Sequence, residues 1–143
     1  MSNEVIGRDA LLKLVPHAGS MCLLERVTSH SELTIHCAAV SHRDPAHPLR
    51  RDGQLAALYL AEYAAQAMAA HGALSSSGGS ARPGMLAALR SIRLHADRID
   101  DIVSELLIDA TRRIAQSDGS LYEFSVRGDG RLLAEGRIAI ALF

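Results

Sequence analysis

The feature that most constrains this 143-residue sequence is an apolar run at residues 52–72, DGQLAALYLAEYAAQAMAAHG. Alanine, leucine and methionine dominate the run, and no proline or β-branched residue interrupts it, so it favours a helix. Asp52 can cap the amino end, and Gly72 stands where helices commonly end in a left-handed turn. Because a helix that is apolar on all sides is normally buried, the run predicts a central helix enclosed by the rest of the chain.

Glu62 and Gln66 are the polar pair inside this run. They are four residues apart, so they share one helix face with Tyr59 and Leu55. An unpaired buried charge is costly, so both side chains need partners. A structural Glu–Gln pair at a subunit edge and a functional acid with its pKa tuned by an apolar surround both fit this pattern. Their position in mid-run, among weakly hydrophobic alanines, argues against a membrane span.

The overall composition narrows the classes of function. The net charge is −1, 3% of the residues are aromatic and tryptophan is absent, which argues against a nucleic-acid partner. Residues 1–10 show no basic segment followed by an apolar run, so we expect no signal peptide and a cytoplasmic location. Cys22 and Cys37 lack CxxC spacing and are expected to be reduced core residues, not a redox pair or metal ligands. We expect residues 1–143 to form one domain without a metal or cofactor.

Apolar stretches with strand character flank the central run on both sides. The candidate strands are residues 21–27, 33–40, 85–95, 102–115, 121–127 and 132–143. Residues 33–40 alternate with a period of two, Asp129 and Gly130 form a tight hairpin signal, and Gly136 suggests a bulge or a close backbone approach. A single helix can be enclosed by its own chain only if the sheet curls around it. The expected fold is therefore α+β, with a curled antiparallel sheet of about six strands around one long helix.

Four short stretches carry a family resemblance. They are LVPH at residues 14–17, MCLLERV at 21–27, EYAAQA at 62–67 and DGRLLAEG at 129–136. In this order they resemble the 3-hydroxyacyl-acyl carrier protein dehydratases of the hotdog superfamily. The closest resemblance is to the small dehydratase-like proteins of aryl polyene and related lipid biosynthesis clusters. The resemblance implies the hotdog fold, an acyl thioester on acyl carrier protein as substrate, and a homodimer or a heterodimer with a second hotdog protein.

The resemblance also implies site residues. In that family the central-helix glutamate works with a histidine from the preceding loop, across a dimer interface. Glu62 matches the glutamate, and His47 is the nearest match to the histidine, about one residue out of register. The loop lacks the family's Pro-Gly pair at the helix entry, and Ala57 takes the expected glycine position. His17 is the second candidate histidine, for the site or for a structural hydrogen bond. The expected substrate-binding residues are Gln66, Gly53, Tyr59 and Leu58.

Dehydration of a 3-hydroxyacyl thioester needs three kinds of group. A base near neutral pKa, such as His47, removes the proton beside the carbonyl. A protonated carboxyl group, such as Glu62, donates to the departing hydroxyl. Backbone N–H groups at the amino end of the helix meet the developing negative charge. Two alternatives stay open: an acyl thioesterase of the same fold, and a catalytically weak subunit that pairs with an active dehydratase.

Overall fold

The computed structural model describes residues 5–15, 21–75, 85–116 and 119–142. The chain begins with a short helix, α1 (Arg8–Leu11), and two strands, β1 (Arg26–His30) and β2 (Thr34–Ala39). Two 3₁₀ turns, η2 (Ser41–Arg43) and η3 (Ala57–Tyr59), lead into the long helix α2 (Leu60–Ser75). Four strands follow: β3 (Met85–Leu94), β4 (Leu106–Ala115), β5 (Gly119–Gly128) and β6 (Arg131–Leu142).

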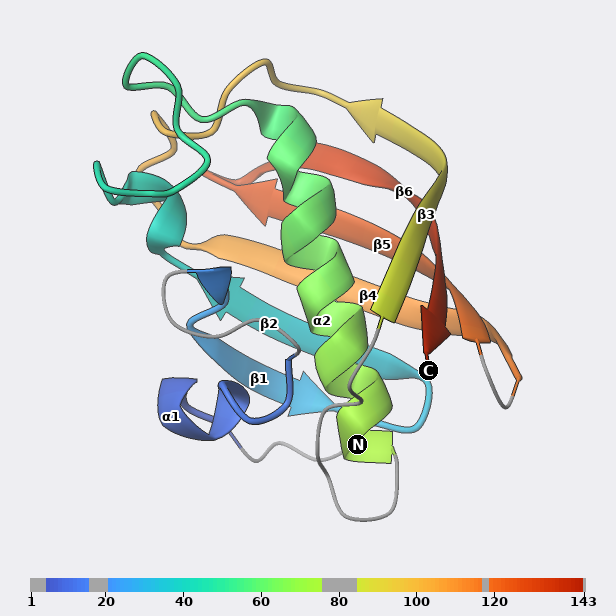
Figure 1. The fold of residues 1–143 in the computed structure, drawn as a ribbon. Coiled ribbons are helices and arrows are strands. Elements are labelled where there is room, and N and C mark those ends of the chain that lie inside the picture. The colour runs from blue at the N-terminus through green and yellow to red at the C-terminus, as the bar shows by residue number, and fades with distance from the viewer. Residues whose placement is uncertain (1–4, 16–20, 76–84, 117–118, 143) are drawn as a thin grey trace.

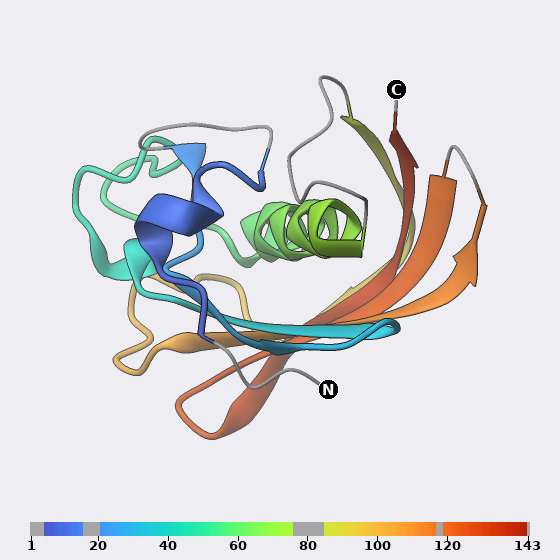
Figure 2. The same ribbon diagram turned by 90° about the horizontal axis from the view of Figure 1, so that it is seen from below.

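The six strands form one antiparallel sheet in the order β1-β2-β4-β5-β6-β3. The sheet curls around α2, which lies against its concave face (Figure 1). Seen along the helix, β3 and β6 rise on one side of α2 while β1 and β2 pass beneath it (Figure 2). The expected fold, six antiparallel strands around one helix, is confirmed.

Period-two alternation in the sheet supplies the surface that α2 covers. On β5, the side chains of Tyr122, Phe124 and Val126 are buried, whereas Glu123 and Ser125 between them are partly exposed. The buried residues of β4 alternate in the same way. Eleven residues of α2 are buried, so the helix is enclosed on most of its circumference, as its near-absence of polar residues predicts.

The limits of the helix differ from the sequence prediction. Asp52 does not cap it: Asp52 and Gly53 have φ values of 54° and 75° and form a turn in which Arg51 and Gln54 exchange backbone hydrogen bonds of 2.8 and 2.9 Å. These left-handed conformations cannot belong to a right-handed helix, so α2 begins only at Leu60. Gly72 does not end it either, since the helix continues to Ser75 with Ala73 packed in the core.

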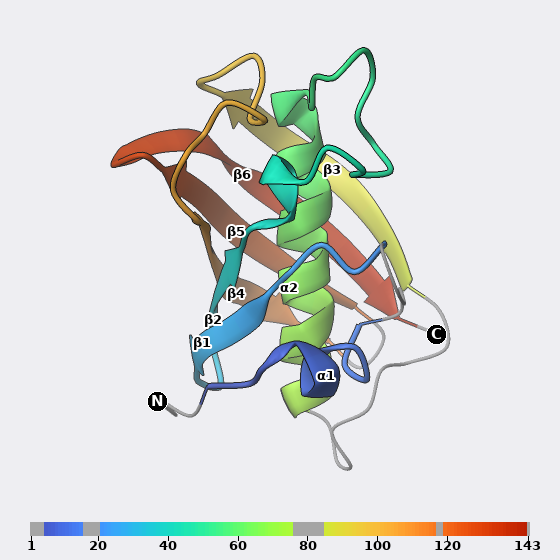
Figure 3. The ribbon, with the colours of Figure 1, turned by 90° about the vertical axis from the view of Figure 1, so that its left-hand side faces the viewer.

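The first predicted strand is also displaced. Residues 21–24 are not in the sheet, and β1 begins at Arg26. The cause is a competing partner, because the backbone N–H of Leu23 donates to the side chain of Gln66 on α2. With α1, this segment covers the side of α2 that lies opposite β3 (Figure 3), and Leu11, Leu23 and Leu24 in it are fully buried.

Two turn and strand signals hold as predicted. Asp129 and Gly130 have φ values of 50° and 73°, as the central residues of the β5–β6 hairpin require. Gly136 lies where β6 meets β3, and a Cβ atom there would be 2.2 Å from the carbonyl oxygen of Ser91.

Both cysteines are free and buried, as expected, and burial raises the pKa of Cys37 to about 12. In the described part of the chain, no helix is long and apolar enough to cross a membrane.

Candidate functional site

The structure brings Glu62 and Gln66 together at the first turns of α2. The side-chain amide of Gln66 donates from Nε2 to Oε1 of Glu62 over 3.2 Å. Glu62 is partly exposed, whereas Gln66 is fully buried one turn further along. The pair therefore presents a carboxyl group at the surface of an otherwise apolar helix.

Gln66 is held in one orientation by the backbone of the segment before β1. Its Oε1 accepts the N–H of Leu23 over 2.8 Å, and its Nε2 donates to the carbonyl oxygen of Met21 over 2.7 Å. A backbone N–H can only donate and a carbonyl can only accept, so the amide cannot turn over. Its N–H side consequently always faces Glu62.

His47 lies on a different side of the helix entry. Its Nδ1 accepts the backbone N–H of Leu49 over 3.0 Å, and its Nε2 lies 3.1 Å from the hydroxyl of Tyr63. Both ring nitrogens are thus engaged within the chain. Neighbouring residues of a helix point about 100° apart, so the phenol that meets His47 and the carboxyl of Glu62 leave α2 in different directions.

The Tyr63 hydroxyl continues this polar chain into the core. It lies 2.8 Å from the hydroxyl of Ser41, which donates to the carbonyl oxygen of Leu23 over 2.7 Å. Tyr63 is fully buried and His47 is 5% exposed. Burial lowers the pKa of His47, with a further contribution from the positive charge of Arg50, so the imidazole stays neutral at physiological pH.

A hollow of about 290 Å³ opens beside His47. It is lined by Arg8, Cys22, Glu25, Val40, Ser41, Asp44, Ala46, His47 and Pro48. Glu62 does not line it, so this hollow does not join the predicted histidine to the predicted acid.

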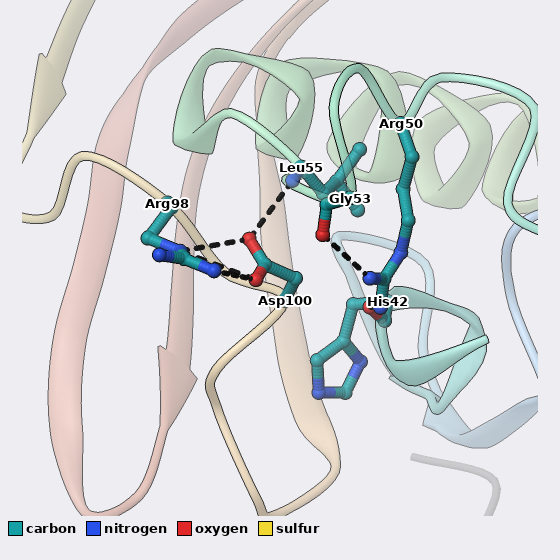
Figure 4. Close-up of polar contacts among 6 residues, drawn as sticks. All are labelled: His42, Arg50, Gly53, Leu55, Arg98 and Asp100. Atoms are coloured by element: carbon teal, nitrogen blue, oxygen red, sulfur yellow. Dashed lines mark hydrogen bonds and ion pairs between the residues drawn. The ribbon is translucent and has the colours of Figure 1, made fainter. Parts of the chain in front are cut away.

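The segment that leads into α2 is hydrogen-bonded to the loop between β3 and β4. The N–H of Ala57 donates to the carbonyl oxygen of Asp97, and the N–H of Ile99 donates to that of Leu55, each over 2.9 Å. Asp100 accepts the N–H of Leu55 on Oδ1 over 2.8 Å and pairs with Arg98 (Figure 4). The hydrogen bonds from the Arg98 guanidinium lower the pKa of Asp100 to about 2, so this carboxylate stays charged.

The remaining predicted binding residues surround this entry without converging on one point. Gly53 is exposed, and its carbonyl oxygen accepts from Arg50, whose other terminal nitrogen donates to the carbonyl of His42 (Figure 4). Leu58 is half exposed, and Tyr59 is partly buried against the core. His17, the second candidate histidine, lies outside the described residues.

Two neighbours of the predicted site residues escaped the sequence analysis. Tyr63 was treated as part of the apolar run, although a phenol in a buried helix needs a hydrogen-bond partner and could have been paired with a loop histidine on that ground. Asp100 gave no signal of its own, since nothing in the sequence places the β3–β4 loop against the helix entry.

One of the comparisons with known proteins gives a family, and another gives structures of similar fold. The family model described as ApeP-like, ApeP dehydratase, matches residues 10–142. No curated protein sequence matches the chain significantly.

Among solved structures, the dehydratase heterocomplex ApeI:P from Xenorhabdus doucetiae is similar with a TM-score of 0.81 and 22% identity, over 93% of this chain and 90% of that one. A Helicobacter felis protein has a TM-score of 0.62 and 18% identity, with coverages of 94% and 88%. A thioesterase from Haemophilus influenzae has a TM-score of 0.59 and 14% identity, with coverages of 89% and 83%.

Proposed function

The chain belongs to the ApeP-like dehydratase family, and from that premise we propose that it dehydrates 3-hydroxyacyl thioesters carried on acyl carrier protein, in aryl polyene biosynthesis. Residues 10–142 match the family model, so all six strands and α2 take part in the match. The hotdog dehydratase fold accounts for the curled sheet, the enclosed helix and the carboxyl group at the start of that helix.

The observation that carries the proposal is the Glu62–Gln66 pair. Loss of water requires a proton for the departing hydroxyl, and a carboxyl group can supply it. Because the Gln66 N–H donates to Oε1 of Glu62, that oxygen acts as an acceptor, and the transferable proton would sit on Oε2. Gln66 is thus proposed as the positioning residue for the acid.

We also propose that the active form pairs with a second hotdog subunit. The similar Xenorhabdus structure is a dehydratase heterocomplex. In this chain β3 is an edge strand of the sheet, and Leu89 and Leu94 on it are 52% and 41% exposed. An edge with unpaired backbone groups and exposed leucines favours the addition of another strand from a partner.

Product analysis tests the reaction. Incubation of the complex with a 3-hydroxyacyl thioester on acyl carrier protein should give the trans-2-enoyl thioester with no free thiol. Release of free thiol without enoyl product would instead assign the chain to the thioesterases of this fold and overturn the proposal.

A further inference from the structure

We propose that the outer face of the sheet, turned away from α2 (Figure 2), carries a second binding site, which takes a medium-chain carboxylate. The site is a hollow of about 430 Å³, within the size range of small-molecule pockets. Its lining residues come from β3, β6, β5 and the end of β4, and none of them belongs to α2. The inference therefore goes beyond the dehydratase reaction, whose proposed acid lies on α2.

Strand pairing places the hollow on the face that α2 leaves uncovered. Tyr122 on β5 and Ile138 on β6 are directly opposite each other, and both are buried. The Tyr122 hydroxyl lies 2.6 Å from Nδ1 of His71 on α2, so this pair faces the helix. Successive side chains of a strand point to opposite faces of the sheet. Leu121 and Ala139, the preceding and following residues, therefore point outward.

An apolar row crosses four strands within the hollow. Each member is paired with the next across the sheet, and the row consists of Ala88 on β3, Ala139 on β6, Leu121 on β5 and Ile114 on β4. The short alanines leave space beside the longer Leu121 and Ile114, and Ile114 is 52% exposed. At a strand spacing of about 4.8 Å the row is roughly 14 Å long, which suits an extended medium-chain alkyl group. Such a chain would cover apolar surface that now faces water.

Positive charge borders the apolar row on one side. β-Bulges interrupt β3 and β4 next to the row, and the extra residue is an arginine in each strand, Arg90 and Arg113. A bulge re-aims a side chain, and both arginines are exposed. On β6, the strand next to β3, Arg137 pairs with Glu123, which also accepts from Arg113. Three guanidinium groups share one carboxylate, so this border of the hollow is net positive.

An apolar row beside guanidinium groups fits an anion with an alkyl tail. The carboxylate would accept hydrogen bonds from Arg90, which lines the hollow, and the tail would lie along the row. Burial of the tail would supply most of the affinity, since an exposed ion pair contributes little. The charge decides which amphiphiles bind, because the arginines repel a cationic head group.

The hollow would stay accessible in a complex that adds a strand at the β3 edge. The outward side chains of an edge strand keep their face when the sheet is extended, so Ala88 and Arg90 would still point away from α2. The site can therefore be tested in the chain alone and in its complex.

Titration of the full chain with dodecanoate, followed by nuclear magnetic resonance of its isoleucine and leucine methyl groups, locates the ligand. Binding should saturate at one ligand per chain, and the methyl signals of Ile114 and Leu121 should shift most. Glu62→Gln should bind dodecanoate as the wild type does, because Glu62 does not line the hollow. Shifts centred on methyl groups that face α2, such as those of Ile138, or a changed Kd in Glu62→Gln, would overturn the inference.

Variants of outward residues test the two halves of the site by calorimetric titration. Ala139→Leu fills the hollow and should raise the Kd for dodecanoate about tenfold with unchanged melting. Arg90→Gln should raise it about threefold, as expected for one exposed ion pair. Arg93→Gln is the matched control, because Arg93 is an exposed arginine of the same strand outside the hollow. Equal Kd values in the wild type and Ala139→Leu, or in Arg90→Gln and Arg93→Gln, would overturn the inference.

Other ligands and occupants complete the test. Dodecyltrimethylammonium, with the same tail and a cationic head group, should bind about tenfold more weakly than dodecanoate, and equal binding would contradict the role of the arginines. Sedimentation with phosphatidylglycerol vesicles that is lost in Ala139→Leu, without saturable dodecanoate binding, would assign this face to a lipid surface. Self-association that is lost in Ala139→Leu would assign it to a second copy of the chain. Either result overturns the inference.

Discussion

The hydroxyl of Tyr63 lies 3.1 Å from Nε2 of His47, and this contact turns the histidine ring toward Tyr63 and not toward the carboxyl group of Glu62, the preceding residue of the helix. The sequence places Glu62 and Tyr63 side by side, but the helix turns them toward different surroundings. Glu62 reaches the surface beside Gln66, and Tyr63 points into a buried polar chain.

Tyr63→Phe should destabilise the chain by about 1–3 kcal/mol, the usual cost of leaving a buried donor without its acceptor. The phenyl ring fills the same space, so the loss isolates the hydroxyl. The orphaned group is the Nε2–H of His47, which is almost fully buried. Urea unfolding measures the change, with Tyr59→Phe as the matched control on a partly buried tyrosine. Equal stability of the two variants would contradict the polar chain described here.

Stability should fall as the pH drops below about 6.5. Burial lowers the pKa of His42, His47 and His71 in the folded chain. Folding therefore favours the neutral form of each histidine. The contribution of each histidine to the free energy of unfolding is complete above its ordinary pKa, and it is lost as the pH falls through the lowered pKa of the folded state. His71 is a clear case, since its ring joins the Tyr122 hydroxyl at 2.6 Å to the Ser31 carbonyl at 2.9 Å.

The unfolding free energy of the wild type and of His71→Gln, measured at pH 7.5 and pH 5.5, checks this origin. The variant should be less stable at pH 7.5 but should show a shallower pH slope, by up to about 1.4 kcal/mol per pH unit. His36→Gln is the control, because His36 is only partly buried and pairs with Asp109 on the outer face of the sheet. An unchanged slope in His71→Gln would show that His71 does not carry the acid sensitivity.

Asp100→Ala should loosen the entry to α2. The substitution leaves the N–H of the fully buried Leu55 without its acceptor, at a cost of about 1–3 kcal/mol. Hydrogen exchange should accelerate more at Leu55 and Ala57 than within α2. Asp101→Ala, at an exposed neighbouring position, is the control, and equal exchange in both variants would argue against the pinning role of Asp100.

Gly136→Ala should separate β6 from the edge strand β3. The added Cβ would lie 2.2 Å from the Ser91 carbonyl, which is backbone and cannot turn aside. We expect a loss of about 1–3 kcal/mol, or about 3–10 °C in Tm, and weaker association with the partner subunit. Gly7→Ala meets nothing within 4 Å and should melt as the wild type does. A normal Tm for Gly136→Ala would contradict the close approach.

The sequence predicted the sheet well because its signals are local. Alternation in residues 33–40 and 121–127 and the turn at Asp129 and Gly130 each depend on neighbouring residues only. The predicted start of the helix was wrong because that prediction also relied on local signals alone. Composition extends the helical pattern back to Asp52, whereas the left-handed turn there and the ladder to residues 97–99 arise from contacts with distant segments.

In the candidate site, too, the contacts that are local in sequence were predicted and the contacts between distant segments were not. The pairing of Glu62 with Gln66 follows from a spacing of four on a helix and was predicted. The partners of His47 and Ala57 were not predicted. Tyr63 lies 16 residues from His47, and Asp97 lies beyond α2 and β3 from Ala57, so each pair meets only through the fold. The base role of His47 stays a prediction.

The most direct test of the central role of Glu62 is kcat for dehydration of a carrier-bound 3-hydroxyacyl thioester by the complex, wild type against Glu62→Gln. Glutamine keeps the shape and the contact with Gln66 but has no proton of suitable acidity, so we expect a loss of about 10²–10⁴-fold, the usual worth of a general acid. Glu32→Gln, at an exposed carboxylate in the β1–β2 turn, should keep the wild-type rate. A Glu62→Gln complex within threefold of the wild type would contradict the assignment of the acid.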